Sequence, residues 1–379
     1  MAAWAARGAL ADAHAKPISS LKFSKSGDQL ASASADRSVK VWATAELLAN
    51  DSSNDPQRDS AGDASAASKK PQIALYGHEE GVNDASWSHD GYYLASASDD
   101  KTARIWDVEY GKTLSILGRT SSSTSTFNMH GIAMDATELA PPGTSAAAAA
   151  ALGLLGENES HTGYVFSAQF NPQGSLIVTA SFDETVRFWD VRTGRSVAVL
   201  SAHHEPIVSA NFNHDGTLLI TASYDGLVRI WDVATRECLR TIITEPTVPL
   251  SHAQFTPNSR YVVFGTLDSK LRLWDYAKER CVKQFAGHVN QRYCCVAAFG
   301  RPRDGYAGNT HPLLLYGSED GRVCMWDMQT EALVEELKIA SGTAAAATHQ
   351  PIMAVDHHPD KHIVAAAANK TISMWEQTK

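Results

Sequence analysis

The side chains best suited to bind a metal ion lie close together near the C-terminus. The run Asp356-His357-His358-Pro359-Asp360-Lys361-His362 places His358 and His362 four residues apart. That spacing forms a zinc site when both residues lie on one face of a helix. The flanking segments alternate as strands do, so the run is predicted to be a turn, and no metal ligands are assigned.

The sequence also lacks the known catalytic motifs. It contains no P-loop, no G-x-S-x-G motif, no H-E-x-x-H motif and no set of kinase motifs. No acid–base pair is expected to converge. The chain is therefore predicted not to be an enzyme and to need no cofactor.

A different set of polar and aromatic residues recurs along the chain. Ser181–Gly194 (SFDETVRFWDVRTG) has a near-copy at Ser223–Arg236 (SYDGLVRIWDVATR), and five weaker copies occur elsewhere. Each copy has an acid, or Asn369 in the last, six residues before a tryptophan. The acids are Asp36, Asp100, Asp183, Asp225, Asp268 and Asp320; the tryptophans are Trp42, Trp106, Trp189, Trp231, Trp274, Trp326 and Trp375.

The spacing of these positions indicates one repeat domain. Successive copies lie 64, 83, 42, 43, 52 and 49 residues apart. A bare period of 42 to 43 residues, lengthened by insertions, is that of a four-stranded propeller blade. Within a repeat, a histidine precedes an apolar strand, a turn rich in Asn, Asp and Gly, and further alternating strands.

On these residues the chain resembles the WD-repeat (WD40) β-propeller family. The resemblance implies an all-β, seven-bladed β-propeller of four-stranded antiparallel blades over residues 1–379. It also implies that the His, Asp and Trp of each repeat are linked by hydrogen bonds, because unpaired buried polar groups are costly. The last repeat, Ile352–Trp375, supplies only three strands. Trp4–Leu10 is therefore predicted to pair with it and close the ring.

Four insertions interrupt the repeats. Residues 43–71 in blade 1 are rich in Ser, Asp and Ala and are predicted to be disordered. Residues 118–160 form a low-complexity insertion between blades 2 and 3, and residues 340–350 form a low-complexity loop between blades 6 and 7. Because successive strands run in opposite directions, these two insertions are predicted to lie on the same face of the ring as the Asp turns. The blade 1 insertion and the blade 6 insertion, residues 301–311, are predicted to lie on the opposite face.

Composition restricts the class of partner. The formal net charge of -9 at pH 7 argues against nucleic acid as the main partner and favours a basic peptide. No apolar run reaches the roughly 18 residues of a membrane span, and no secretory signal is expected. The cysteines favour free thiols in a reducing compartment, since no C-x-x-C pair occurs among Cys238, Cys281, Cys294, Cys295 and Cys324.

The repeats differ at the residue before each acid, where seven turns are expected to meet at the mouth of the central channel. That position holds Ala35, Asp99, Phe182, Tyr224, Leu267, Glu319 and Ala368. A solvent-facing turn has little use for Phe182 and Tyr224, and Phe166 is expected to point to the same mouth. These aromatic residues either plug the ring or form a binding site.

The SFDE and SYDG turns, and His161–Gln329 as a whole, are most similar to the WD-repeat protein 5 group, the scaffold subunits of COMPASS-type histone H3 lysine methyltransferase complexes. The resemblance implies that the mouth binds an arginine of a histone H3 tail or of a methyltransferase motif, with the guanidinium stacked on aromatic faces. The residues implied are Ala35, Asn83, Asp99, Phe166, Phe182, Tyr224, Ser251, Tyr293, Cys294 and Val296.

Three positions depart from that group. Asn83 and Val208 stand where the group has serine, and Val296 stands where it has a second sandwiching phenylalanine. We therefore expect weaker arginine binding or a different ligand motif.

The same resemblance implies a second surface on the opposite face, between blades 5 and 6. There Asn258, Leu273 and Gln329 match a cleft that binds a hydrophobic segment of a partner subunit. The prediction is a non-catalytic nuclear scaffold, monomeric within a hetero-complex, that binds neither nucleic acid nor membrane directly. The alternative is a WD-repeat scaffold of another complex, such as a splicing particle or a ubiquitin ligase adaptor.

Overall fold

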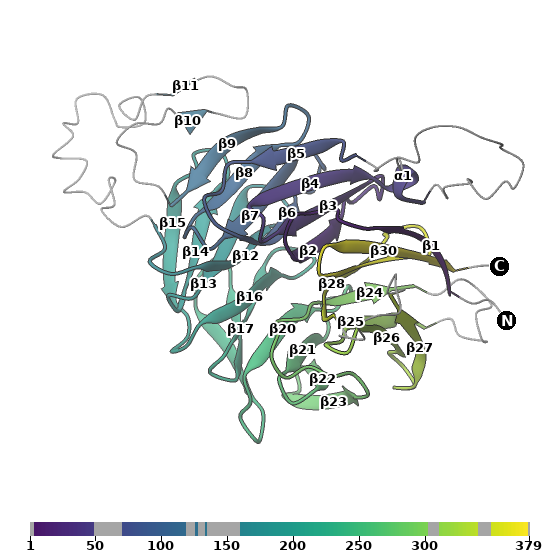
Figure 1. Ribbon diagram of the computed structural model, residues 1–379. Coiled ribbons are helices and arrows are strands. Elements are labelled where there is room, and N and C mark those ends of the chain that lie inside the picture. Colours follow the sequence, from purple (N-terminus) through teal and green to yellow (C-terminus); the bar gives the residue numbers. More distant parts are fainter. Residues whose placement is uncertain are drawn as a thin grey trace, which may run out of the picture.

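The computed structural model describes residues 4–48, 70–118, 126–127, 133–134, 160–301, 311–339 and 350–377. Within these residues the chain forms seven four-stranded antiparallel sheets that follow one another as the blades of a ring (Figure 1). The all-β, seven-bladed architecture predicted from the repeats is confirmed. No helix in the described ranges is long and apolar enough to cross a lipid bilayer.

The first three blades contain the N-terminal repeats. Blade 1 consists of β2 (Ile18–Phe23), β3 (Gln29–Ser34), β4 (Ser38–Ala43) and β5 (Ile73–Tyr76). Blade 2 consists of β6 (Val82–Trp87), β7 (Tyr93–Ser98), β8 (Ala103–Asp107) and β9 (Lys112–Leu117). Blade 3 consists of β12 (Val165–Phe170), β13 (Leu176–Ser181), β14 (Thr185–Asp190) and β15 (Ser196–Ser201).

The next three blades follow the same order. Blade 4 consists of β16 (Ile207–Phe212), β17 (Leu218–Ser223), β18 (Leu227–Asp232) and β19 (Cys238–Ile243). Blade 5 consists of β20 (Leu250–Phe255), β21 (Val262–Thr266), β22 (Lys270–Asp275) and β23 (Arg280–Phe285). Blade 6 consists of β24 (Ala297–Gly300), β25 (Leu313–Gly317), β26 (Arg322–Asp327) and β27 (Leu333–Lys338).

Blade 7 is built from both ends of the chain. It contains β28 (Ile352–His357), β29 (Ile363–Ala368), β30 (Thr371–Gln377) and, on its outer edge, β1 (Trp4–Leu10). β1 pairs antiparallel with β30 from Trp4 opposite Gln377 to Leu10 opposite Ile372, and Figure 1 shows the two strands side by side. The predicted closure of the ring by Trp4–Leu10 is confirmed.

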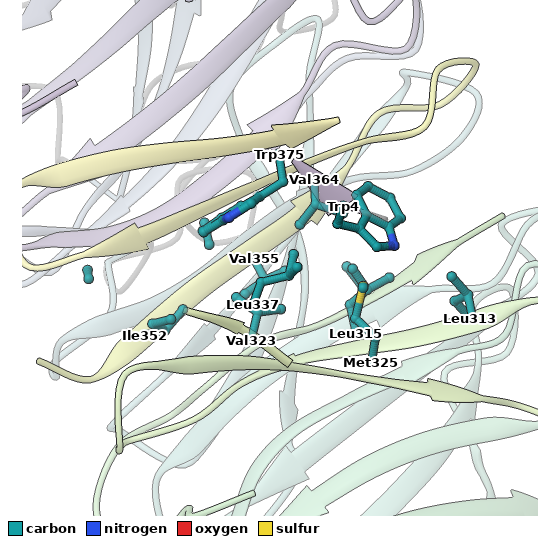
Figure 2. Packing of buried hydrophobic residues seen from close by; sticks show 13 residues of the cluster. Trp4, Leu313, Leu315, Val323, Met325, Leu337, Ile352, Val355, Val364 and Trp375 are labelled. Carbon is teal, nitrogen blue, oxygen red and sulfur yellow. The ribbon is translucent and has the colours of Figure 1, made fainter. Parts of the chain in front are cut away.

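The hydrophobic core lies between the blades. Each of seven buried apolar clusters in the described chain takes side chains from two neighbouring blades, so each sheet covers the face of the next. Figure 2 shows the cluster between blades 6 and 7, where Trp4 of β1 lies near Leu313 and Val364. Fully burying one such side chain contributes about 1.5–3 kcal/mol. Ring closure therefore adds core packing as well as backbone hydrogen bonds.

In blades 1 to 4 a buried hydrogen-bond chain joins the Asp turn to the tryptophan. In blade 3, His161 Nδ1 lies 2.9 Å from the Asp183 carboxylate, and its Nε2 lies 2.7 Å from the Thr179 hydroxyl. Trp189 Nε1 donates to the same hydroxyl at 2.8 Å. Equivalent chains link His14–Asp36–Ser32–Trp42, His78–Asp100–Ser96–Trp106 and His203–Asp225–Thr221–Trp231.

The protonation states of this chain follow from its geometry. A carboxylate only accepts hydrogen bonds, so Nδ1 of His161 carries the proton and the neutral ring accepts at Nε2. Burial lowers the pKa of His161, which keeps the ring neutral. Burial alone would raise the pKa of Asp183, but hydrogen bonds from His161 and Thr185 outweigh it and hold that pKa well below its usual range.

The expectation that every repeat carries this link is wrong for blades 5 and 6. The hydroxyl position, four residues before the acid, is Phe264 in blade 5 and Tyr316 in blade 6. Asp268 pairs instead with Arg272 at 3.3 Å, and Asp320 pairs with Arg322. In blade 7 the hydroxyl position is Ala365, so this blade lacks the hydroxyl group as well.

His288 of blade 6 is buried without the usual partners. Neither ring nitrogen makes a hydrogen bond to any described residue. The ring contacts Tyr316 and Trp326 edge to face, with centroid distances of 5.0 and 5.5 Å. Burial lowers the pKa of His288 to about 4.

The insertions are only partly described. The expectation of disorder over residues 43–71 does not hold at its start, where α1 (Thr44–Leu48) buries Leu47 in the cluster between blades 7 and 1. The insertion 118–160 contributes a two-stranded sheet of β10 (Thr126–Phe127) and β11 (Ala133–Met134). Residues 49–69, 119–125, 128–132 and 135–159 of these two insertions lie outside the described residues. The same holds for residues 302–310 of the blade 6 insertion and residues 340–349 of the blade 6–7 loop.

Replacing the closing tryptophan is expected to destabilise the whole ring. Trp4→Ala empties a site between blades 6 and 7 and should lower the free energy of unfolding by about 3–5 kcal/mol. Chemical denaturation measures the effect. Arg7→Ala is the control on the same strand, since its ion pair with Glu376 is about 40% exposed and contributes at most about 1 kcal/mol. Equal effects of the two substitutions would contradict the closing role of Trp4.

His288 is expected to make the fold acid-sensitive. Its folded pKa of about 4 lies below the unfolded value near 6.5, so between these pH values the unfolded chain takes up a proton that the native chain does not. Stability is therefore lost as the pH falls through this window. His288→Phe removes that loss and should raise the melting temperature more at pH 5 than at pH 7.5. The same change at both pH values would refute this account.

Candidate functional site

The channel mouth is formed where the first strands of the blades begin. First strands of neighbouring blades contact one another around the axis, as β12 does with β6 and β16. Within blade 3, Val165 at the start of β12 pairs with Ser181, the residue before Phe182. The second residue of the first strand and the residue before the acid therefore lie at the same end of the blade. Phe166 and Phe182 occupy these two positions.

A cavity of about 230 Å³ lies at this end of the channel. Of the ten residues expected at the mouth, those that line it are Asn83, Phe166, Tyr224, Ser251, Tyr293, Cys294 and Val296. Val208 lines it as well. The volume is enough for several water molecules or a flat cationic group. The aromatic residues thus surround a space instead of filling it.

The remaining three residues lie at the rim. A Cβ placed on Gly81 would come within 3.3 Å of Ala35 Cα and 3.5 Å of Asp99 Oδ2, so both residues flank this glycine. The Asn83 amide donates to Asp99 Oδ1 at 2.8 Å and to the Val165 carbonyl at 3.0 Å. Asn83 therefore joins a rim carboxylate to the wall of the cavity.

Aromatic rings form one side of the mouth. The rings of Phe166 and Phe182 lie 6.3 Å apart and are tilted by 50°. Tyr164 contacts Phe182 edge to face at 6.0 Å. Phe182 is 49% exposed and Tyr293 is 37% exposed, so both offer ring surface to a ligand from solvent.

The opposite side of the mouth depends on the loop before β24. The Glu319 carboxylate accepts hydrogen bonds from the backbone N–H groups of Gln291, Arg292 and Tyr293 at 2.8, 2.6 and 2.9 Å. Cys294 in this loop lies 3.3 Å from the Tyr224 hydroxyl. Burial raises the pKa of both groups, so the thiol and the phenol stay protonated at neutral pH.

Charged residues line the deeper part of the channel. Lys22 lies near Asp84 and Asp356 and lowers the pKa of both carboxyl groups, although burial, the larger effect, raises them above the usual range. Asp84 accepts hydrogen bonds from Ser20 and Ser167 at 3.0 Å and from Gln169 at 2.8 Å. Burial lowers the pKa of the neighbouring His252 to about 3, so this ring is neutral.

Sequence reasoning missed the polar lining of the channel. Lys22, Asp84, Arg292 and Met353 line the mouth cavity but were not expected there. Of these four, only Lys22 had a signal, since the fifth residue of the first strand is polar in six blades: Lys22, Ser86, Gln169, Asn211, Gln254 and Asp356. Arg292 adds a positive charge to the cavity wall, which opposes binding of a cation.

Lys283 crosses the second predicted surface, the cleft between blades 5 and 6. Leu273 is 4% exposed and belongs to the core between blades 5 and 6. Lys283 Nζ donates to the Met328 carbonyl at 2.9 Å and to the Gln329 carbonyl, so it bridges the two blades. Asn258 is exposed, and its side-chain oxygen accepts from the Thr256 hydroxyl at 2.7 Å.

The histidine-rich run near the C-terminus forms the turn that the sequence predicts. His357 ends β28, and His358 Nδ1 accepts the backbone N–H groups of Asp360 and Lys361 at 3.1 and 2.9 Å. Within the described ranges, no group of three or more His, Cys, Asp or Glu side chains could hold a metal ion.

Comparison with known proteins places these features in a family. The profile of the WD domain, G-beta repeat, matches seven segments of the chain: residues 9–43, 69–107, 153–190, 194–232, 236–275, 279–327 and 344–376. Together these segments cover more than half of the chain, and each spans the first three strands of one blade.

Several curated proteins are similar to the chain. The COMPASS component SWD3 of Saccharomyces cerevisiae is 28% identical over 70% of this chain and 74% of its own length. A subunit of chromatin assembly factor 1 from Gallus gallus is 30% identical over 48% of this chain and 25% of its own length. A ribosome biogenesis protein WDR12 homolog of Arabidopsis thaliana is 24% identical over 51% of this chain.

The extent of these matches differs. The chain spans a quarter of the chromatin assembly protein and 46% of the ribosome biogenesis protein, but about three quarters of the yeast COMPASS component. With seven profile matches on seven closed blades, the chain belongs to the WD40 family of WD-repeat β-propeller proteins.

Proposed function

We propose that the protein is a non-catalytic WD-repeat scaffold of a COMPASS-type histone H3 lysine methyltransferase complex in the nucleus, and that its channel mouth binds an arginine-containing peptide. The observation that carries this proposal is the open cavity bounded by Phe166, Tyr224 and Tyr293. A guanidinium is flat and always charged, and it stacks on aromatic faces for up to about 2 kcal/mol when desolvated.

Electrostatics supports a cationic ligand at the rim. Asp99 lies there as a half-buried carboxylate neighbour of Gly81, and Asp84 lies deeper in the same cavity. Lys22 and Arg292 line the cavity too and oppose a cation. Because these positive and negative charges oppose each other, we expect modest affinity for an arginine side chain, with stacking on Phe166 as the main attractive contact.

The choice of complex rests on the relatives. The yeast protein named as a COMPASS component matches over most of its length, and a second relative is named for chromatin assembly. These names support a chromatin complex and a nuclear location. Val208 and Val296, which lie in the cavity wall, are the residues that favour the alternative of a scaffold in another assembly. Co-purification from native extract separates the two: methyltransferase subunits support the proposal, whereas splicing or ubiquitin ligase subunits would replace it.

The second contact of the scaffold is proposed on the opposite face between blades 5 and 6. Leu273 itself is buried, so a hydrophobic partner segment would contact the half-buried Tyr261, Phe299 and Met328 that pack against the same core cluster. Asn258 and Gln329 are exposed beside them and offer polar contacts.

Phe166→Ala is expected to weaken binding of a histone H3 amino-terminal peptide at least about tenfold, because stacking on one wall of the cavity is lost. Isothermal titration calorimetry measures this. Tyr110→Ala is the control, since Tyr110 is 69% exposed and does not line the cavity. An H3 peptide with lysine in place of each arginine should bind weakly to the unaltered protein. Unchanged affinity of Phe166→Ala would reject the arginine site.

Val296→Phe is expected to strengthen the same interaction by about threefold to tenfold. The half-buried Val296 lines the cavity, and a ring there supplies a second face for the guanidinium. Val208→Leu adds apolar volume to the same wall without a π face and serves as the matched control. A gain with Val208→Leu but not with Val296→Phe would contradict the proposed stacking.

A further inference from the structure

A second cavity lies at the other end of the channel. It measures about 550 Å³ and is formed by the last residues of the first strands of blades 1 to 4 and by the turns that follow them. Lys22, Gln169 and Asn211 line both this cavity and the one at the mouth. These three side chains therefore lie between the two ends of the channel. The second cavity, which we call the basic cavity, is reached from the face opposite the Asp turns.

The charge of the basic cavity is opposite to that of the chain as a whole. Lys22, Lys25, His89 and His214 line it, and none of the described residues that line it is Asp or Glu. Since Lys22 lies near Asp84 and Asp356 deeper in the channel, Lys25 is the main source of positive charge at the entrance. The whole chain carries a formal charge of -9. A local surplus of cations on an acidic protein attracts an anionic partner selectively.

The walls of the basic cavity are aromatic. The four blades contribute Phe23, Trp87, Phe170 and Phe212, each the last residue of its first strand. Trp87 and Phe212 are half-buried, and Trp87 Nε1 donates to the Lys22 carbonyl at 2.9 Å, which fixes its ring. Aromatic walls with a few cationic groups suit a peptide better than a free anion, because a peptide brings apolar area as well as charge.

The lysine and histidine side chains of the basic cavity are positioned across two blades. Lys25 of blade 1 reaches the turn of blade 2, where its Nζ lies 2.6 Å from His89 Nε2. An ammonium has three donors, so after this contact two remain for a carboxylate. Lys25, His89 and His214 are all exposed, so the ammonium group and the two imidazole rings are open to solvent.

The basic cavity continues outward between blades 2 and 3. An adjoining cavity of about 480 Å³ shares Ser88, His89, Phe170 and Pro172 with it. Tyr93 and Val191 supply apolar area in this outer part. Asp90 and Asp190 also line this outer part, so carboxylates of a ligand are favoured at the axis and an apolar side chain is favoured here. The two cavities together form a groove that runs from the channel axis to the edge of the ring.

We propose that this groove docks an extended acidic peptide segment of a partner protein. Carboxylates of the segment bind Lys25 and the neighbouring histidines at the axis, and an apolar side chain lies outward between blades 2 and 3. The site is on the face opposite the arginine site, so both segments can bind at once.

Fluorescence anisotropy tests the proposal with a labelled peptide in which a run of glutamates is followed by leucine and phenylalanine. The full-length protein should bind it at low salt, and Lys25→Glu and His214→Glu should each weaken binding about tenfold or more. Lys278→Glu is the matched control, because Lys278 is an exposed lysine on the same face in blade 5 and makes the same change of charge. A copy of the peptide with lysine in place of glutamate should not bind.

Several outcomes would overturn the proposal. No binding of the acidic peptide, or an equal loss with Lys278→Glu, removes the groove as its site. Tighter binding of a single-stranded DNA oligonucleotide that is lost in Lys25→Glu would assign the basic cavity to a nucleic acid instead. The test is independent of the arginine site: Phe166→Ala should leave the acidic peptide bound, and Lys25→Glu should leave the H3 peptide unaffected.

Discussion

The buried hydrogen-bond chain from carboxylate through imidazole and hydroxyl to indole fixes the position of the functional residues in blades 1 to 4. Phe182 and Tyr224 each precede the acid of that chain, Asp183 and Asp225. Because the acid is held by a histidine and by backbone N–H groups, the residue before it has a defined place at the channel mouth. The acid that begins this hydrogen-bond chain and the aromatic residue of the candidate site are therefore neighbours in one turn.

Where this hydrogen-bond chain is missing, other interactions take its place. In blade 6 the aromatic Tyr316 fills the hydroxyl position, and its hydroxyl lies 2.7 Å from that of Ser251 in blade 5. The mouth at this point is built by the loop that Glu319 holds through three backbone N–H groups. Hydrogen bonds to a carboxylate are roughly twice as strong as neutral ones, so three of them constrain the loop firmly. The rim is thus uneven, with turns on one side and a carboxylate-held loop on the other.

The sequence predicts those features that depend on period and strand count. The acid–tryptophan spacing yields seven blades, and the missing strand after Trp375 yields the role of Trp4–Leu10. The loss of the hydrogen-bond chain in blades 5 and 6 could also be predicted from the sequence. Phe264 and Tyr316 cannot replace the small serine or threonine that supplies the hydroxyl in blades 1 to 4. The channel lining was harder to predict. Lys22 and Asp84 belong to different blades, and only the folded ring shows that they lie close to each other in the channel.

Contacts between distant segments limit prediction in the same way. Tyr224 meets Cys294, which is 70 residues further along the chain. Lys25 meets His89 across 64 residues. Neither pair follows from a local pattern, because the distance between two blades depends on how the whole ring packs. The arginine site was inferred from resemblance, whereas the basic groove became visible only when four turns were seen together.

The pairing of β1 with β30 sets the order of events during biosynthesis. Leu10 is made 362 residues before its partner Ile372, by their positions in the sequence. At usual elongation rates the interval is roughly 20 to 70 s. Throughout it, the first strand and the growing series of blades present unpaired backbone edges, which are prone to aggregation. Until Ile372 has been made, the first strand cannot form its native pairing.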